Sequence, residues 1–392
     1  MTLQARQIEA RIRTFAPELI AIRRDLHAHP ELAFEERRTS EFLASELERY
    51  GYQVERGLAG TGVVGTLTRG NGPLTIGIRA DMDALPIAEA TGRDYASRAP
   101  GKMHACGHDG HMTMVLGAAR CLAEMGKFRG TVRIIFQPAE EDISGAKRMV
   151  EEGLFEKLPC DAVFALHNLP GFPAGQFAFR DGAIMAAADV ATLTVHGRGA
   201  HCAEPWKAID PILVGSAIVL RLRREVEKAV DPSSGSVVNI CTFHGGTISN
   251  VIPATSVMEA AVRSFNETDR NTLEATIRRV CREEGERFGA NVEVNYERGY
   301  PATINSTAEM QFARETALTC VEPEQVRDLE RPFGLAEDFA YMLQRRPGCY
   351  FGLGIGEDRH PLHSPLYDFN DDCLVPGAVY WTKLAHDYLA AA

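Results

Sequence analysis

The stretch from Gly101 to His111 combines one thiol, that of Cys106, with the imidazoles of His104, His108 and His111. Thiolate and imidazole groups are the side chains that bind borderline-soft divalent metals such as zinc. The stretch also opens an apolar pattern with helical spacing. We therefore expect a metal site that begins here and is completed by residues from other parts of the chain.

Acidic residues or a histidine directly follow each of three predicted strands. They are Asp81 and Asp83 after 74–79, Glu140 and Glu141 after 131–136, and His167 after 162–166. Ligands of open α/β sheets bind at the carboxyl ends of the strands. The pattern therefore predicts that these side chains meet at one edge of a sheet.

Five side chains together favour a metal centre: Cys106, His108, Glu141, His167 and His363. Each has an ordinary structural explanation when taken alone, such as a buried thiol, a solvated helix start or a surface histidine. Carboxylates, imidazoles and a thiolate can jointly hold two divalent ions about 3.5–4 Å apart, which activate a water and polarise a carbonyl. The joint pattern indicates such a centre.

The chemistry of that centre needs further roles. Of Glu140 and Glu141, one should bind metal while the other acts as general acid and base. A histidine that binds metal usually donates its second N–H group to a carboxylate, and Asp83 or Asp81 can accept it. His27 and His29 could also be ligands, although a polar helix end before a proline explains them equally well.

The elements that must position these residues alternate between helices and strands, which predicts an α/β fold with a largely parallel sheet. A helix over 5–26, interrupted at Pro17, and a helix over 36–50 come first. From residue 188 the predicted order is β-α-β-β-α-β, the split βαβ or ferredoxin-like plan. Its elements are 190–195, 211–230, 236–243, 255–264, 269–288 and 291–296. We expect a metal-binding domain of 1–187 and 299–392, and an inserted domain of 188–298.

Composition narrows the class of protein. The chain has 392 residues, of which 45% are hydrophobic and 24% charged, as in ordinary globular proteins. Its net charge of −11 argues against binding to nucleic acid or to an anionic membrane. We find no apolar run near the roughly 20 residues that span a bilayer. The nine cysteines are scattered and odd in number, which favours a reducing cytoplasm.

Eight runs carry a resemblance to a known family. They are His27–Glu36 (HAHPELAFEE), Arg79–Ile87 (RADMDALPI), Met103–His111 (MHACGHDGH), Phe136–Glu141 (FQPAEE), Gly199–Pro205 (GAHCAEP), Asn250–Pro253 (NVIP), Ala336–Phe339 (AEDF) and Leu362–Ser364 (LHS). On these runs the chain resembles the metallo-amidohydrolase family of aminoacylases, hippurate hydrolase, bacterial N-acyl-amino-acid amidohydrolases and plant auxin-conjugate hydrolases. The runs span nearly the whole chain in the family's order.

The resemblance implies roles for the metal-binding domain. Five positions match the metal ligands of the cysteine-containing branch: Cys106, His108, Glu141, His167 and His363. Glu140 matches the general base and Asp83 the supporting aspartate. Relatives outside this branch have an aspartate where this chain has Cys106.

The resemblance also implies roles for the inserted domain, which matches the family's lid. His201 matches a histidine that polarises the scissile carbonyl, sometimes across a dimer interface, although a buried loop histidine is the alternative. Asn250 resembles a substrate-positioning amide. Arg263 matches a residue that binds the free carboxylate of the amino acid, although a surface strand arginine is equally consistent. A homodimer through the lid is implied, and a monomer is left open.

The expected activity is the metal-dependent hydrolysis of the amide of an N-acyl-L-amino acid to a carboxylate and a free amino acid. The alternatives within the hydrolases are a dipeptidase or carboxypeptidase and a deacetylase of the N-acetyl-diaminopimelate type. The sequence does not choose among zinc, manganese, cobalt and nickel, which all accept this ligand set. The acyl group and the preferred side chain are also left open.

Overall fold

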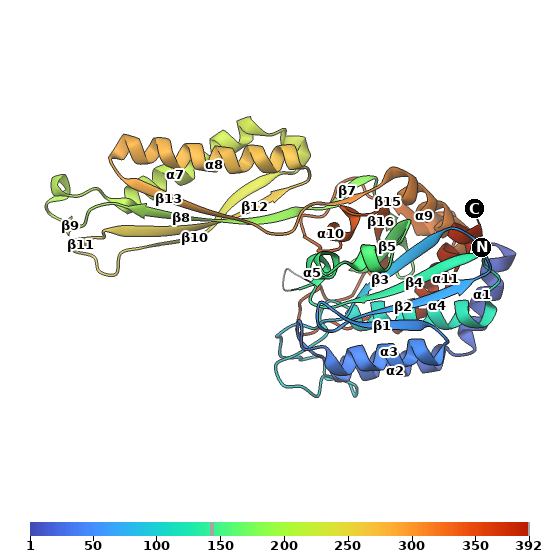
Figure 1. Cartoon of the computed structure of the whole chain (residues 1–392). Coiled ribbons are helices and arrows are strands. Elements are labelled where there is room, and N and C mark those ends of the chain that lie inside the picture. The colour runs from blue at the N-terminus through green and yellow to red at the C-terminus, as the bar shows by residue number, and fades with distance from the viewer. Residues whose placement is uncertain (142–144, 391–392) are drawn as a thin grey trace. The chain divides into compact units, whose positions relative to one another are not determined.

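The computed structural model describes residues 1–141 and 145–390. The chain forms two compact units (Figure 1). The first contains Met1–Ile184, Ile304–Arg331 and Asp338–Ala392, and the second contains Met185–Thr303 and Pro332–Glu337. The second unit thus extends slightly beyond the expected 188–298 at both ends. It also includes 332–337, which the sequence assigned to the other domain.

The first unit is built on an eight-stranded sheet of order β1-β2-β4-β3-β5-β16-β6-β15. Its central strands β4, β3, β5 and β16 are parallel neighbours, which confirms the predicted α/β class with a largely parallel sheet. The strands are β1 (Gln53–Leu58), β2 (Gly62–Arg69), β3 (Thr75–Asp81), β4 (Gly130–Gln137), β5 (Ala162–Pro170), β6 (Phe177–Phe179), β15 (Val326–Asp328) and β16 (Gly348–Gly356). A separate short ribbon pairs β7 (Gly182–Met185) with β14 (Thr303–Asn305).

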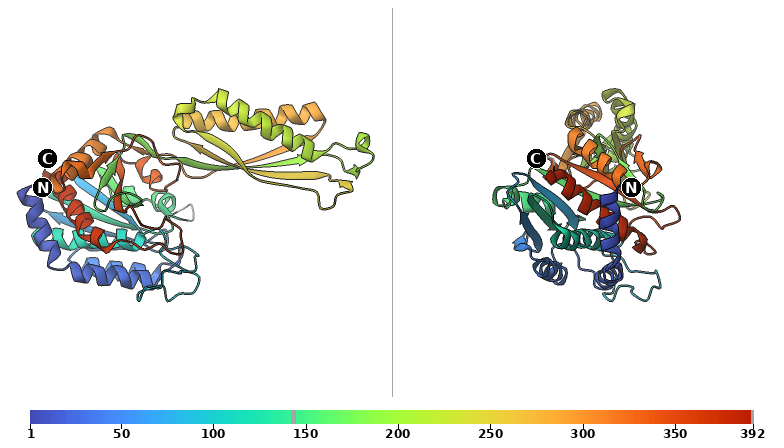
Figure 2. Two further views of the ribbon diagram at one scale, coloured as in Figure 1. Left: turned by 180° about the vertical axis from the view of Figure 1, so that it is seen from behind. Right: turned by 90° about the vertical axis from the view of Figure 1, so that its right-hand side faces the viewer.

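Helices cover this sheet and contribute much of its core. They are α1 (Leu3–Arg13), α2 (Ala16–Ala28), α3 (Arg37–Arg49), α4 (His108–Met125), α5 (Gly145–Glu151), α6 (Leu154–Lys157), α9 (Thr307–Cys320), α10 (Ala340–Leu343) and α11 (Leu374–Ala390). Helices α4 and α11 lie side by side (Figure 2). Their contact is close, because a Cβ atom added to Gly377 would come within 2.1 Å of the Met114 sulfur.

Two features of this unit follow from local sequence. The predicted helix over 5–26 is interrupted, since α1 ends at Arg13 and α2 begins at Ala16 with Pro17 in its first turn. Proline is tolerated there because the first turn leaves backbone N–H groups without helical acceptors. Strands β3 and β5 are buried along nearly their whole length, as expected for parallel strands covered on both faces.

The second unit is a four-stranded antiparallel sheet of order β10-β12-β8-β13, with α7 and α8 against one face. Its elements are β8 (Ala187–His196), β9 (Ala200–His201), α7 (Pro211–Ala229), β10 (Val237–Gly245), β11 (Val251–Ile252), β12 (Thr255–Ser264), α8 (Glu267–Phe288) and β13 (Asn291–Arg298). The predicted β-α-β-β-α-β order is present, with the small β9–β11 ribbon added to it. Helix α8 is capped at one end by the Asn266 side chain and at the other by Gly289, which has a positive φ of 71°.

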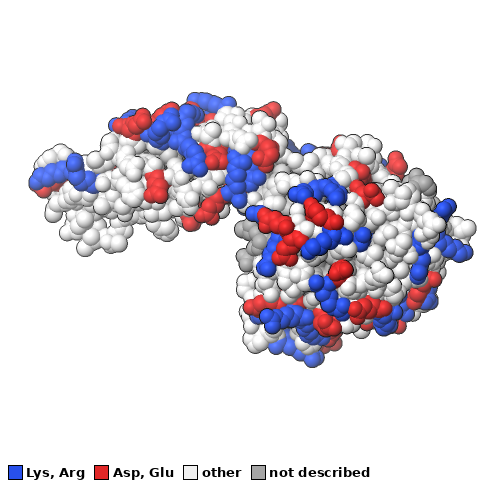
Figure 3. All heavy atoms as spheres, in the orientation of Figure 1, with Lys and Arg blue, Asp and Glu red and all other residues white. Residues whose placement is uncertain are grey.

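The exposed surface carries charges of both signs. On the face drawn in Figure 3, basic and acidic side chains are interspersed over each unit. Many of them form ion pairs, such as Arg120 with Glu18 in the first unit and Arg298 with Glu274 in the second. Within residues 1–141 and 145–390, none of the helices combines the length and apolar character needed to cross a bilayer.

Candidate metal centre and active site

The candidate site lies at the carboxyl ends of three adjacent strands, β4, β3 and β5. Asp81 is the last residue of β3, and Glu140 follows the end of β4 by a short turn. His167 lies within β5, so the prediction that the strand ends before it is wrong. The strand continues because β16 pairs alongside it, with Gly352 opposite His167.

Cys106 is fixed by the turn that starts α4. Gly107, the residue before the helix, has a φ of 93°, in the left-handed region that glycine adopts without strain. A Cβ atom at Gly107 would lie 2.4 Å from Nδ2 of Asn168 and 2.5 Å from the Tyr367 hydroxyl oxygen. The same Asn168 amide donates to the carbonyl oxygen of Cys106 at 2.5 Å. Only glycine therefore permits this close approach.

The five predicted ligands come together from distant parts of the first unit. Sγ of Cys106 lies 3.3 Å from Nε2 of His167. Oε1 of Glu141 lies 3.2 Å from Nε2 of His363 and 4.0 Å from Nε2 of His108. The donor atoms form two groups that could each hold an ion and that share Cys106, namely Cys106, His108 and His167, and Cys106, Glu141 and His363.

In two of the imidazoles Nδ1 is occupied by a hydrogen bond, and Nε2 is the atom that could bind a metal ion in this cluster. Nδ1 of His108 donates to the backbone carbonyl of Asp83, and Nδ1 of His167 donates to that of Asn168, each at 2.8 Å. Nε2 of the neutral His167 therefore keeps a lone pair. Burial alone would lower the pKa of His108, but the carboxylates of Asp81, Asp83 and Glu141 raise it to about 10, so a cation bound to Nε2 of His108 must displace a proton. Nε2 of His108 and Oε1 of Glu141 are buried and make no hydrogen bond to the described residues, which fits a place for a divalent cation between the surrounding groups.

One detail of the predicted support is wrong. The carboxylate of Asp83 or Asp81 was expected to accept the second N–H group of a ligand histidine. His108 and His167 instead donate to backbone carbonyls, and Asp81 accepts from Nδ1 of His111 at 2.7 Å. The expectation failed because a backbone oxygen close in space cannot be recognised from residue type.

The protonation of the cluster depends strongly on burial. Burial raises the pKa of the Cys106 thiol, and the nearby carboxylates of Glu141 and Glu140 raise it further. Burial together with the neighbouring His111 lowers the pKa of His167, which keeps that imidazole neutral. Thiolate and neutral imidazole are the forms that bind metal, so a bound cation must displace the thiol proton.

Asp83 positions the two adjacent glutamates. Its Oδ1 accepts the backbone N–H group of Glu140 and its Oδ2 accepts that of Glu141, each at 3.0 Å. Its own carbonyl holds His108. One aspartate therefore ties β3 to a candidate ligand on α4 and to both carboxylates that follow β4. Glu140 is buried, and its carboxylate lies in a group with His108 and Glu141.

A second connecting residue, Asn168, had no role in the sequence interpretation. Its backbone and side-chain N–H groups approach Nε2 of His111 at 3.1 and 3.0 Å, and Tyr367 donates to its side-chain oxygen at 2.6 Å. With His111 held by Asp81, these contacts form a continuous buried network behind the ligands. A second buried polar residue next to His167, in a strand that is otherwise apolar, was the signal that could have identified Asn168.

His27 and His29 lie at the end of α2 and belong to no potential metal-binding group among the described residues. The ring of His27 is buried between Asp109, whose Oδ2 lies 2.9 Å from Nδ1, and Glu89, whose Oε1 lies 3.3 Å from Nε2. Nδ1 of His29 donates to the backbone carbonyl of Asp25. The alternative of a polar helix end therefore describes both residues.

The three candidate residues of the second unit fall at two places. His201 lies on β9, paired with Val251 of β11, and Asn250 directly precedes that strand. Arg263 lies on β12, where it is half-buried and donates to the carbonyl of Val262. Nδ1 of His201 accepts the N–H group of Ala203 at 3.1 Å. His201 is exposed, so the alternative of a buried loop histidine is wrong.

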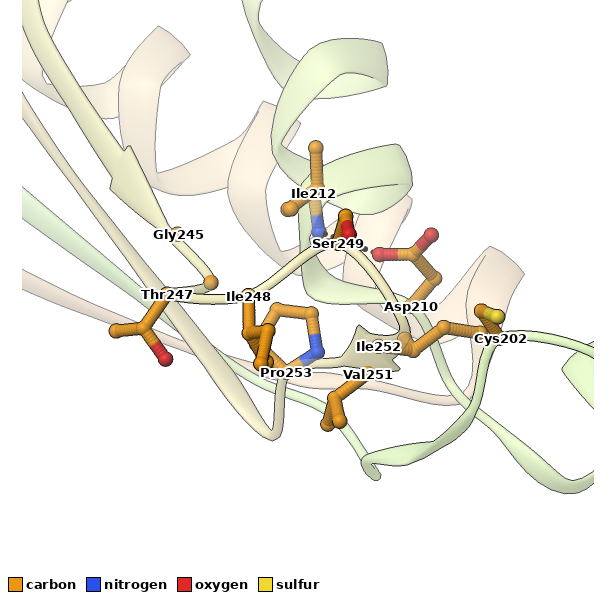
Figure 4. A pocket seen from close by; sticks show the side chains of 11 residues that line it. Cys202, Asp210, Ile212, Gly245, Thr247, Ile248, Ser249, Val251, Ile252 and Pro253 are labelled. Atoms are coloured by element: carbon orange, nitrogen blue, oxygen red, sulfur yellow. Dashed lines mark hydrogen bonds between the residues drawn. The ribbon is translucent and has the colours of Figure 1, made fainter.

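A pocket within the second unit adjoins the β9–β11 ribbon (Figure 4). It is an open hollow lined by the 245–249 segment, the start of α7 and the strand β11. Its lining combines apolar side chains with the hydroxyl groups of Thr247 and Ser249, and Cys202 and Asp210 are its ionisable members. Asp210 is engaged as the N-cap of α7, since its carboxylate accepts the N–H groups of Ile212 and Leu213.

Comparison with known proteins identifies the family. The model of peptidase family M20/M25/M40 matches residues 77–387. The chain is 38% identical over 372 residues to hippurate hydrolase of Campylobacter jejuni, covering 95% of this chain and 97% of that protein. It is 37% identical over 397 residues to IAA-amino acid hydrolase ILR1-like 2 of Arabidopsis thaliana, covering 98% and 89%.

A solved structure agrees with these relatives. The YxeP protein of Bacillus subtilis, described as a dinuclear metal-binding peptidase of the M20 family, matches with a TM-score of 0.85 and 32% identity. The match covers 97% of this chain and 99% of that one. The family match, the relatives that are similar over most of their length and the cluster of side chains that could hold a metal ion agree, and the chain belongs to the peptidase family M20/M25/M40.

Proposed function

We propose that this hydrolase cleaves the amide bond of N-acyl-L-amino acids, giving a carboxylate and a free amino acid, with two divalent metal ions. The observation that carries the proposal is the convergence of thiol, imidazole and carboxylate donors into two groups that share Cys106. Hippurate hydrolase and the auxin-conjugate hydrolase, both similar to this chain over most of its length, are named for substrates of this class.

The residues proposed to hold the ions are Cys106, His108, Glu141, His167 and His363. Bound divalent ions would supply an activated water and polarisation of the scissile carbonyl. The ligand set accepts zinc, manganese, cobalt or nickel. Nε2 of His108, which is buried and has no hydrogen-bond partner among the described residues, supports the assignment of this residue, since such atoms are rare in folded proteins. The 3.2 Å between Oε1 of Glu141 and Nε2 of His363 supports the assignment of those two residues.

Glu140 is proposed as the general base and acid. It takes a proton from the attacking water and delivers it to the departing nitrogen, which otherwise would leave as an unstable amide anion. The support is its buried carboxylate beside His108 and Glu141. Asp83 is proposed to hold Glu140 in place, through the hydrogen bond to the Glu140 backbone.

The second unit is proposed as a lid that supplies substrate contacts. Because Nδ1 of His201 accepts a hydrogen bond from Ala203, the neutral imidazole carries its proton on Nε2. That N–H group is suited to donate to the oxyanion of the tetrahedral intermediate. Asn250 is proposed to position the substrate amide and Arg263 to bind the substrate carboxylate, for which the planar guanidinium is suited.

A homodimer through the lid is part of the proposal. Strand β10 is an edge of the second unit's sheet, and a groove beside it is lined by α7 and β10. Leu220 is 69% exposed and Val237 is 40% exposed in this groove. Exposed apolar edge strands are natural pairing surfaces. We also propose a cytoplasmic location, since all nine cysteines are free thiols.

A second candidate is a dipeptidase or carboxypeptidase, which the description of YxeP as a peptidase favours. The two activities share the metal centre and differ in the carbonyl half of the cleaved amide. In an N-acyl amino acid this half is a simple acyl group, and in a dipeptide or peptide it belongs to an amino acid. A deacetylase of the N-acetyl-diaminopimelate type is the third form of the same chemistry. These alternatives differ in substrate and leave the assigned residues unchanged.

The test is a substrate panel with and without metal. Protein reconstituted with each candidate metal is incubated with hippurate, acetyl-amino acids, auxin conjugates and dipeptides, and released amino groups are quantified. We expect the highest kcat/KM on an N-acyl amino acid, and loss of activity in chelator without loss of the circular dichroism signal. Preference for dipeptides would establish the second candidate, and full activity in chelator would refute the metal mechanism.

A further inference from the structure

The turn Pro138–Glu141 is held by two buried carboxylates from outside it. Three successive backbone N–H groups, those of Ala139, Glu140 and Glu141, point to carboxylate oxygens. Oε1 of Glu36 accepts from Ala139 at 2.9 Å, while Asp83 accepts from the next two residues, each at 3.0 Å. Successive N–H groups of this kind form an anion-binding concavity.

The backbone at the centre of this turn is in an unfavourable conformation. Ala139 has a φ of 51°, in the left-handed region that residues with a Cβ atom rarely adopt. Its side chain is fully buried. Such a conformation persists only where surrounding contacts over-determine it. Ala139 is joined directly to Glu140, so its φ angle helps set the direction of the carboxylate that follows.

Glu36 is placed to impose this conformation. It comes from the start of α3, 103 positions earlier in the chain than Ala139, and is fully buried. Its second oxygen, Oε2, accepts from the Thr61 hydroxyl at 2.7 Å, so both oxygens are engaged. The neighbouring Glu35 is exposed and pairs with Lys102 on the surface. Burying a carboxylate is unfavourable unless its hydrogen bonds are satisfied.

We propose that Glu36 is a positioning residue for Glu140 and Glu141. It holds the Ala139 N–H group and thereby keeps Ala139 in the left-handed conformation from which the two carboxylates reach the metal cluster. This inference rests on the proposed function of Glu140 and Glu141. Without Glu36 the buried Ala139 N–H group loses its acceptor, and the turn relaxes away from the strained φ angle while Asp83 still holds its other two N–H groups.

Four variants test the proposal. Glu36→Ala removes the acceptor, and Glu36→Gln keeps one, since an amide oxygen can accept from Ala139 while the amide N–H donates to Thr61. Glu35→Ala is the matched control on the exposed neighbour. The double variant Glu36→Ala/Ala139→Gly removes the acceptor but supplies a residue that adopts positive φ without strain.

The measurements are zinc affinity of the apoprotein by calorimetry, kcat and KM on the best substrate, and thermal unfolding. We expect Glu36→Ala to lose about 10- to 100-fold in zinc affinity, as for other residues that orient metal ligands. Its kcat should fall while KM stays nearly unchanged. Glu36→Gln and Glu35→Ala should resemble the unmodified protein, and Ala139→Gly in the double variant should restore part of the zinc affinity and kcat.

Two outcomes would overturn the proposal. The first is a Glu36→Ala variant whose zinc affinity and kcat are unchanged when both are measured at a temperature at which the variant is folded. It would show that Glu36 contributes only to stability. A double variant that regains thermal stability but neither zinc affinity nor kcat would show that the Ala139 conformation is not the link. Zinc affinity is measured without substrate, so failure of the proposed substrate class would leave this result unaffected.

Discussion

Sγ of Cys106 lies 3.3 Å from Nε2 of His167, although the two residues are 61 positions apart in the chain. The thiol precedes α4 and the imidazole lies on β5, so the contact depends on the packing of the helix start against the sheet edge. Without a cation the thiol is protonated, because burial raises its pKa, and it can donate to the lone pair of the neutral His167 imidazole. A bound cation would replace that proton and accept a lone pair from each of the two atoms.

Replacement of this thiol should abolish metal binding at the cluster. Cys106 belongs to both candidate groups, so Cys106→Ala removes a ligand from each. Substitution of groups behind metal ligands costs about 10- to 100-fold in affinity, and loss of a direct ligand should exceed about 100-fold. The metal-to-protein ratio after dialysis, measured by elemental analysis, checks this. Cys121→Ala removes another buried thiol and should retain metal. An unchanged ratio in Cys106→Ala would contradict the ligand assignment.

Glu140→Gln should separate metal binding from turnover. The amide keeps the size of the side chain but cannot take a proton, so kcat should fall by about 10²- to 10⁴-fold. Metal content should stay near that of the unmodified protein, because the proposed ligand is the neighbouring Glu141. Glu141→Gln, by comparison, should lose metal. The comparison needs steady-state kinetics and elemental analysis on the same preparations, and a normal kcat in Glu140→Gln would remove this residue from the mechanism.

The sequence predicted that the cluster residues converge, because the convergence follows from one general property of parallel sheets. Parallel strands end at a common edge, so acids and histidines near the ends of 74–79, 131–136 and 162–166 were expected to meet, and the structure brings them together. The family and the α/β class are confirmed. The assignment of the five donors as metal ligands stays a prediction.

Other features depend on contacts that sequence patterns do not encode. The carbonyl of Asp83 as acceptor for His108, and the pairing of β16 that extends β5 through His167, are backbone interactions between distant segments. The bridge between Met185 and Phe333, within the second unit, likewise draws 332–337 into that unit. Residue type carries no signal for such backbone pairing, so the domain bounds and strand ends could be predicted only approximately.

The Asn168 network should be needed for metal affinity. Asn168→Ala removes the amide that contacts His111, the carbonyl of Cys106 and the Tyr367 hydroxyl. We expect zinc affinity to fall by about 10- to 100-fold. Unfolding free energy should fall by about 1–3 kcal/mol, because buried partners are left unsatisfied. Calorimetry and urea denaturation measure the two effects. Asn295→Ala, at an exposed amide of the second unit, is the control, and normal zinc affinity in Asn168→Ala would contradict the positioning role.

The buried His27 should make stability depend on pH. Burial alone would lower the pKa of this imidazole, but hydrogen bonds to Asp109 and Glu89 outweigh burial and raise its pKa to about 9. Arg23 opposes the shift, and the rings of Tyr95 and His104 also face His27. Both ring nitrogens thus act as donors in the folded protein, which is the charged form.

The sign of the effect follows from proton linkage. Below about pH 6.5, the ordinary pKa of histidine, the folded and unfolded states are both protonated and the stabilisation is complete. Between about pH 6.5 and 9 the folded state binds more protons, so the free energy of unfolding decreases as pH rises. The His27 contribution lost across this window is about 3 kcal/mol, at about 1.4 kcal/mol for each pKa unit.

The measurement is urea denaturation of the unmodified protein and of His27→Gln at several pH values from 6 to 9.5. The difference in unfolding free energy should be largest at pH 6 and should shrink steadily toward pH 9.5, because glutamine does not titrate. The slope is the informative quantity, since packing changes add only an offset that is independent of pH. Gln7→Ala, which removes an exposed side chain that does not titrate, should give a curve parallel to that of the unmodified protein. If the difference in unfolding free energy between the unmodified protein and His27→Gln stays constant with pH, His27 is neutral in the folded state. One of its two hydrogen bonds to a carboxylate would then need a proton from the carboxylate.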